Sequence, residues 1–129
     1  MSELYTKYVE NKSNGKIRVG VANAISRREI SGKELDDFII ELEANNQLND
    51  ADIDIIPQSD WNEKYLKTLS NESVGGTFSK KYLLYLGKVA EYVENKKKKN
   101  ALVKAISAGI VVAAVLAIVI GVLMMLGKD

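Results

Sequence analysis

Apolar residues along this chain form short periodic stretches up to about residue 95 and then one uninterrupted run. The run covers Ala105 to Leu126 and reads AISAGIVVAAVLAIVIGVLMML, 22 residues without a charged side chain. As a helix it would be about 33 Å long, close to the roughly 30 Å hydrocarbon core of a bilayer. A single segment in lipid satisfies its backbone hydrogen bonds only as a helix. We therefore predict one transmembrane helix over residues 105–126.

A buried helix in a water-soluble fold is the competing interpretation of this run. It is disfavoured because the rest of the chain is too short to cover the whole circumference of such a helix. The first 30 residues carry charges throughout, so they do not supply the apolar segment of a signal peptide. The run therefore predicts a single-pass protein that is tail-anchored.

Basic residues flank the predicted span unequally. Five lysines precede it or stand at its edge, whereas only Lys128 follows it; the five are Lys96, Lys97, Lys98, Lys99 and Lys104. Lysine and arginine accumulate on the cytoplasmic side of a membrane. We therefore predict a cytoplasmic N-terminal domain, facing the inside of the inner or plasma membrane if the protein is bacterial. The expected parts are a soluble domain (1–95), a polybasic segment (96–104), the span (105–126) and a short tail (127–129).

Small residues recur every fourth position through the span, and residues four apart lie along one stripe of a helix. The members within the span are Ala105, Gly109, Ala113, Ala117 and Gly121. A stripe of small side chains lets two helices approach closely in lipid. We therefore predict that the chain forms a homo-oligomer through this helix.

The soluble part shows mainly helical periodicity and predicts a small all-α bundle. The expected helices are 3–11, 17–30, 31–44 with Asn45-Asn46 as its end, a segment starting near Asp60, and a last one from Ser79. Alternation in 17–21 fits a strand as well as a helix, and 53–56 is equally open between the two. Asn14-Gly15 predicts a turn between the first two helices.

Helix starts are marked by three polar signals. Ser31 with Glu34, and Asp60 with Glu63, have the spacing of a capping box, and Ser79 is a further candidate N-cap. No helix breaker follows Ser79. We therefore predict that the last helix of the bundle continues through the lysines into the span, about 48 residues or roughly 70 Å in all.

Aromatic residues are few, so the larger ones are expected in the core. We assign Trp61, Tyr65, Phe38 and Tyr82 to the interior. Of the remaining tyrosines at 5, 8, 85 and 92, a fraction is expected to be exposed, and Tyr92 is placed close enough to the span to sit at the membrane interface.

Charge and composition exclude several classes of function. Residues 1–95 carry 12 basic and 16 acidic residues, with ten of the acids between Glu29 and Asp60. No basic stripe with interleaved aromatics is present, which disfavours nucleic-acid binding. The chain has no cysteine and no histidine, so the commonest nucleophile, acid–base and zinc options are missing. We predict no enzyme activity and no cofactor or metal.

Two short motifs come near to binding signatures. Asp50, Asp52 and Asp54 have the opening spacing of an EF-hand loop, but Ile55 stands where the loop needs glycine. Gly75-Gly76 precedes a helix start and so resembles an anion-binding turn, although the full spacing of a nucleotide loop is missing. We interpret both as ordinary connections.

The sequence therefore predicts a non-catalytic interaction or scaffold module held at the cytoplasmic face of a membrane. Its expected partners are the lipid bilayer, with anionic lipids included, further copies of itself, and a protein that the sequence does not identify. The alternative is a membrane-active effector or toxin that oligomerises and permeabilises the bilayer. Ser107 is the only polar residue in the span, and a conducting pore usually needs more, which favours the first interpretation.

Overall fold

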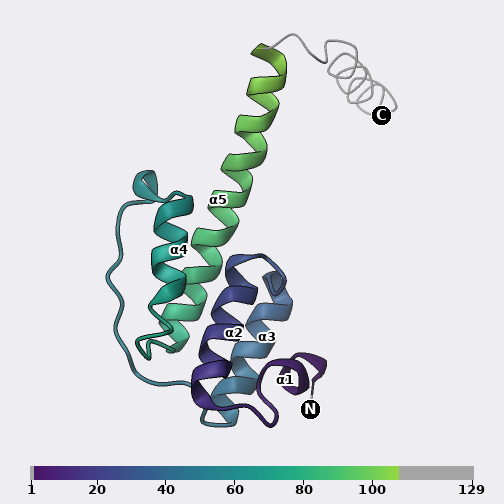
Figure 1. Ribbon diagram of the computed structural model, residues 1–129, viewed down its shortest axis with the longest axis vertical. Helices are drawn as coiled ribbons and strands as arrows, with labels where there is room; N and C mark the ends of the chain where they lie inside the picture. Colours follow the sequence, from purple (N-terminus) through teal and green to yellow (C-terminus); the bar gives the residue numbers. More distant parts are fainter. Residues whose placement is uncertain (1, 108–129) are drawn as a thin grey trace, which may run out of the picture. The chain divides into compact units, whose positions relative to one another are not determined.

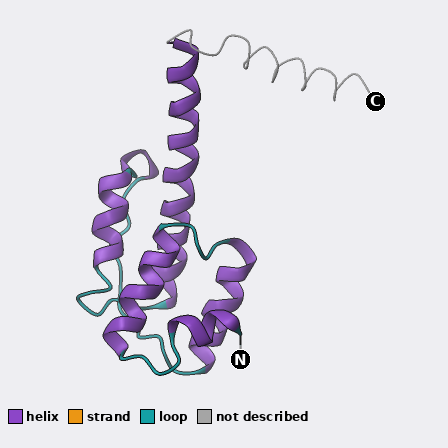
Figure 2. Cartoon of the chain, turned by 45° about the vertical axis from the view of Figure 1, so that its right-hand side comes forward, coloured by secondary structure: helices purple, strands orange, loops and turns teal. Residues whose placement is uncertain are grey.

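The computed structural model describes residues 2–107 of the chain, and within them only helices, turns and loops occur (Figures 1 and 2). Contacts divide the chain into a unit that ends at Glu94 and a second that begins at Asn95. The helices are α1 (Glu3–Tyr8), α2 (Asn14–Ser26), α3 (Gly32–Ala44), a 3-10 turn η1 (Gln58–Asp60), α4 (Glu63–Asn71) and α5 (Lys80–Ser107). The predicted all-α bundle is confirmed.

The connection between α1 and α2 differs from the prediction. Asn14 and Gly15 do not form a turn but are the first two residues of α2, and the Ser13 hydroxyl accepts a hydrogen bond from the Lys16 N–H at 3.5 Å. Polar residues suit a first helical turn because its N–H groups have no partner within the helix. The ambiguous segment 17–21 is therefore helical, with Ile17 and Val21 buried.

Neither predicted capping box forms, although Ser31 is the N-cap residue of α3 as predicted. Ser31 precedes α3, but its side chain makes no capping hydrogen bond, because Gly32 has a φ of +59° and interrupts the regular geometry of a capped start. Asp60 belongs to the η1 turn that follows Pro57, and Asn62 caps α4 instead, accepting from the Tyr65 N–H at 2.8 Å. Local spacing therefore identified the N-cap residue of α3 but not its missing hydrogen bond, and it placed the cap of α4 two residues too early.

Ser79 caps α5 as predicted. Its hydroxyl, in a residue only 4% exposed, accepts from the Tyr82 N–H at 3.1 Å. Asn45-Asn46 ends α3, also as predicted, with Asn46 in the left-handed conformation at a φ of +57°. Asparagine tolerates this conformation better than most residues, which makes it a common helix end.

An extended loop joins α3 to α4, so 53–56 is neither strand nor helix. Asn49 fixes its start: its N–H donates to the Phe78 carbonyl at 2.9 Å, and its side-chain amide donates to the Gly76 carbonyl at 2.6 Å. The Asn49 side-chain oxygen also accepts from the Phe78 N–H at 3.2 Å. One asparagine therefore ties this loop to the turn before α5, although the two segments are almost 30 residues apart.

The core collects side chains from α2, α3 and the first part of α5. The largest fully buried members include Ile25, Ile39, Leu42, Phe78, Tyr82, Leu83, Leu86 and Val89. Gly87 lies at a close approach: a Cβ added there would stand 2.8 Å from a Leu35 methyl carbon and 3.9 Å from one of Ile25. A glycine inside a helix costs about 1 kcal/mol relative to alanine, and the close contact accounts for its position.

Helix α5 runs without a break from Lys80 to Ser107, through the four consecutive lysines. This agrees with the predicted continuous helix as far as Ser107. The rest of the predicted span, residues 108–126, lies outside the described residues. Among residues 2–107, no helix combines the length and the apolar character that crossing a bilayer would need.

Candidate functional site: a basic helix end and an acidic groove

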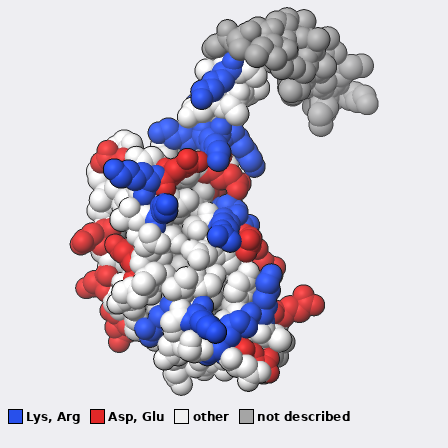
Figure 3. All heavy atoms as spheres, viewed as in Figure 1, with Lys and Arg blue, Asp and Glu red and all other residues white. Residues whose placement is uncertain are grey.

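The last part of α5 carries the strongest local charge of the described chain. From Asn95 to Ser107 there are five lysines and no acidic residue. All five, Lys96, Lys97, Lys98, Lys99 and Lys104, are exposed. Blue basic side chains gather around this stretch of the helix in Figure 3.

Large apolar side chains follow directly after the lysines and are also exposed. Leu102, Val103 and Ile106 are each between 50% and 55% exposed to solvent. Their spacing of i, i+1 and i+4 places them within about 100° of one another around the helix axis, so they share one side of the helix. Three exposed aliphatic residues on one side of a basic helix are typical of a segment that faces a membrane or a partner. Ala105, the first residue of the predicted small-residue stripe, is half-buried; Gly109, Ala113, Ala117 and Gly121 lie outside the described residues.

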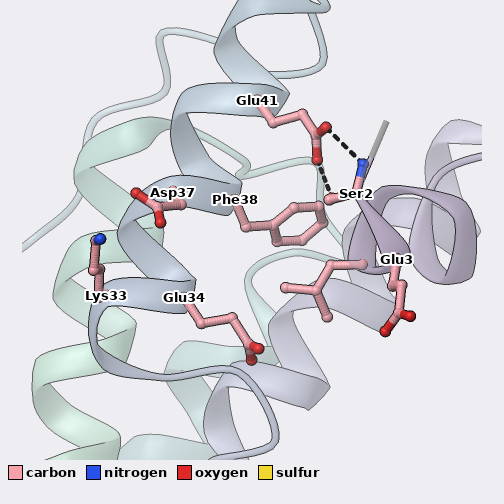
Figure 4. Close-up of a pocket in the computed structure, with 8 residues that line it drawn as sticks. Ser2, Glu3, Lys33, Glu34, Asp37, Phe38 and Glu41 are labelled. Carbon is pink, nitrogen blue, oxygen red and sulfur yellow. Dashed lines mark hydrogen bonds between the residues drawn. The ribbon is translucent and has the colours of Figure 1, made fainter.

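A groove of about 680 Å³ lies between α1 and α3. Its apolar surface comes from Leu4 and Phe38, and its rim carries four carboxylates and one lysine: Glu3, Glu34, Asp37, Glu41 and Lys33. Figure 4 shows the Phe38 ring between the two helices, with the acidic side chains of α3 around it. A groove with an apolar floor and a negative rim suits a ligand that is both apolar and cationic.

Contacts link α3 to α1 and to Ser2, the residue that caps α1. The Ser2 N–H donates to Glu41 at 3.1 Å, and the Ser2 hydroxyl donates to the other oxygen of the same carboxylate (Figure 4). Next to it, the rings of Tyr8 and Phe38 contact each other at 6.4 Å between centroids. Helix α1 has only six residues and none of them is buried, so these contacts fix its position.

An aromatic cluster lies between α5 and the long loop that joins α3 to α4. Trp61 contacts Tyr85 at 5.5 Å and Tyr92 at 5.6 Å between centroids, edge to face in both cases. The Tyr85 hydroxyl accepts from the Ile56 N–H at 3.2 Å and lies 2.9 Å from the hydroxyl of Tyr65. Trp61 and Tyr65, predicted to lie in the interior, are only half-buried, whereas Tyr85 is 7% exposed. Phe38 and Tyr82 are buried as predicted.

Two tyrosines have perturbed acidity. Partial burial, followed by the hydrogen bond with Tyr85, raises the pKa of Tyr65 above its usual range. Burial and then the charge of Glu72 raise the pKa of Tyr82, whose hydroxyl donates to the carbonyls of Leu69 and Ser70 at 2.6 and 3.0 Å. Both phenols therefore stay protonated at neutral pH, the form in which the Tyr82 hydroxyl donates its hydrogen bonds. The Tyr82 hydroxyl joins α5 to the end of α4, and the Tyr65–Tyr85 hydrogen bond joins α5 to the start of α4.

Carboxylates of the long loop come near the end of α4. Asp52, Asp54 and Glu72 line one shallow hollow of about 430 Å³ with Gly75 and Thr77. Partial burial, and then the charge of Asp54, raise the pKa of the Glu72 carboxyl. Within residues 2–107, no group of three or more acidic residues has the arrangement of a metal site.

Sequence reasoning found the lysines of the basic helix end but missed the acidic groove. The acidic bias of residues 29–60 was visible, yet nothing in the spacing indicated that α1 would lie against α3 and enclose part of it. The chain matches no family model, no curated protein and no solved structure.

Proposed function

We propose that this protein is a non-catalytic interaction module, held at the cytoplasmic face of a membrane by residues 105–126. The supporting observation is the change in character along α5. Between Tyr82 and Val93 the helix supplies a large part of the bundle core, whereas from Asn95 onward it exposes lysines and then Leu102, Val103 and Ile106. Basic residues followed by apolar ones are the order in which a helix enters a bilayer from the cytoplasm.

The membrane attachment is tested by flotation of the full chain with vesicles after washing at high pH. We expect the wild-type chain to stay with the vesicles. Replacing Val112, Leu116 and Val119 with lysine should release it, because a charge at the centre of a span costs about 2.5–3.5 kcal/mol on insertion scales. The matched control replaces the exposed bundle residues Ile40, Ile55 and Val74 with lysine and should leave flotation unchanged. A wild-type chain that remained in the aqueous fraction would overturn the proposal.

The span also associates with further copies of itself in this proposal. Its small residues at 105, 109, 113, 117 and 121 would let two helices pack closely. Gly109→Leu with Ala113→Leu should abolish self-association in a membrane reporter assay. Val111→Leu with Val115→Leu adds bulk away from the stripe, so this pair is the matched control and should keep self-association. Equal signals from the two variants would contradict a packing role for the stripe.

The groove between α1 and α3 is the surface that we assign to the recruited protein. Its charge favours a cationic segment, and its apolar floor of Leu4 and Phe38 favours one with an exposed aliphatic or aromatic residue. Such a segment is supplied by an amphipathic helix with lysine or arginine at its edges. The bundle would then select its partner by charge and hold it through the apolar contact.

A photo-crosslinking residue at position 34, inside the groove, tests this assignment in membranes of the source cells. We expect an adduct with a partner peptide that carries net positive charge. The yield of this adduct should fall severalfold when Asp37→Asn is added. The control places the same crosslinker at Lys67, an exposed position of α4. No adduct at position 34, or the same adduct from both positions, would refute the groove as the partner surface.

Permeabilisation by the same helix is the outcome that would replace the scaffold proposal. Induced expression in the presence of a membrane-potential dye separates the two. A scaffold is expected to leave the membrane potential unchanged. An effector would depolarise the membrane rapidly, and the lysine substitutions in the span would abolish this depolarisation.

A further inference from the structure

The four consecutive lysines of α5 form a ring around the helix and not a stripe along it. Successive residues of an α-helix are rotated by roughly 100°, so Lys96, Lys97, Lys98 and Lys99 point in four directions that together cover the full circle. They rise by only about 4.5 Å from first to last. We call these four residues the lysine collar, and all four are exposed.

The collar lies at a fixed height below the predicted span. Lys99 precedes Ala105 by six residues, which is about 9 Å along a helix axis, and α5 is helical throughout this interval. The headgroup layer of one leaflet is about 5–8 Å thick. The long, flexible lysine side chains can extend toward this layer from below, so the four ammonium groups reach the level of the phosphates.

The distribution of charge distinguishes an upright helix from one that lies flat. A helix lying in the interface concentrates its lysines on one face and its apolar residues on the other. A ring of lysines would then place about half of its charges away from the membrane. A helix that enters the bilayer upright meets headgroups on every side, and the ring places one lysine toward each of them.

We propose that the lysine collar binds the headgroups of anionic phospholipids around an upright α5. This inference depends on the membrane attachment proposed above and adds the class of lipid and the geometry of binding. The segment from Asn95 to Ser107 carries five lysines and no acidic residue, so its own net charge is positive. The attraction to an anionic leaflet grows with each lysine held near the surface.

The test measures lipid selectivity with the full chain in vesicles of phosphatidylcholine containing spin-labelled lipids. We expect the spin-labelled phosphatidylglycerol to associate severalfold more strongly than the spin-labelled phosphatidylcholine at low salt. Lys96→Gln, Lys97→Gln, Lys98→Gln and Lys99→Gln together should bring the ratio close to one. The matched control removes four exposed lysines of the bundle by Lys12→Gln, Lys64→Gln, Lys67→Gln and Lys88→Gln, and should keep the preference.

Single substitutions test the ring itself. An upright collar predicts that each of the four single lysine-to-glutamine variants lowers the ratio by a similar factor. A helix lying flat predicts that one or two positions dominate, and that result would overturn the collar. A chain that enters the vesicles but shows no preference for the anionic lipid overturns the collar alone. A chain that fails to enter vesicles of either kind overturns the membrane attachment and the collar with it.

Discussion

The two ends of α5 have the same secondary structure but depend on different interactions. From Lys80 to Val93 the helix is packed on one side by the bundle, and Tyr82, Leu83, Leu86 and Val89 are buried. From Asn95 to Ile106 its described side chains are exposed, apart from the half-buried Ala105. The comparison teaches that a continuous helix does not have uniform stability, because packing against the bundle supports one part of it, whereas the side chains of the other part are exposed.

The largest expected difference concerns a buried and an exposed leucine of the same helix. Leu86→Ala should lower the free energy of unfolding of the bundle by about 2–5 kcal/mol, because it removes a fully buried side chain and leaves a cavity. Leu102→Ala, at a position that is 50% exposed, should change it by no more than about 0.5 kcal/mol. Urea titration followed by circular dichroism, with the full chain in detergent, measures both. Equal losses at the two positions would contradict the comparison.

A smaller effect is expected at the capped start of α5. Ser79→Ala removes the hydroxyl that accepts from the Tyr82 N–H and should cost about 0.5–2 kcal/mol. Ser31→Ala, before α3, should cost much less, because that hydroxyl makes no capping hydrogen bond. The same urea titration decides between them. A larger loss at Ser31 than at Ser79 would restore the capping box that the sequence predicted.

The smallest effect is a pH dependence in the packed unit. Burial raises the pKa of Glu72, so the folded state binds this proton more tightly than the unfolded state does. The resulting stabilisation is present below the pKa that Glu72 has in the unfolded state, about 4.3. It is lost as the pH rises through the raised pKa that Glu72 has in the folded state. Glu72 is largely exposed, so solvent screens most of this effect. Glu72→Gln should therefore stabilise the bundle only slightly at pH 7, within about 0.5 kcal/mol, and give no gain at pH 3.5.

Thermal unfolding at the two pH values, with Glu10→Gln as a substitution at another exposed glutamate, checks this prediction. The gain should be confined to Glu72→Gln and to the higher pH. A gain of the same size at pH 3.5 would show that the charge of Glu72 is not its cause.

The sequence by itself determined the helical class, the start of α5 at Ser79 and the end of α3 at Asn46. These features depend on interactions between residues close together in the chain, such as periodic apolar positions, one capping hydroxyl and one residue tolerant of positive φ. The sequence also located the lysines of the collar, because exposure follows from charge alone.

Only the tertiary structure decided which residues of the loops and helix starts contact one another. Asn49 binds the turn before α5, Tyr85 is buried while Trp61 covers it, and α1 lies across Phe38 to form the groove. Each of these contacts joins segments about 24 residues or more apart in the chain. Their free energy depends on how several helices pack at once, so no local pattern of residues specifies them.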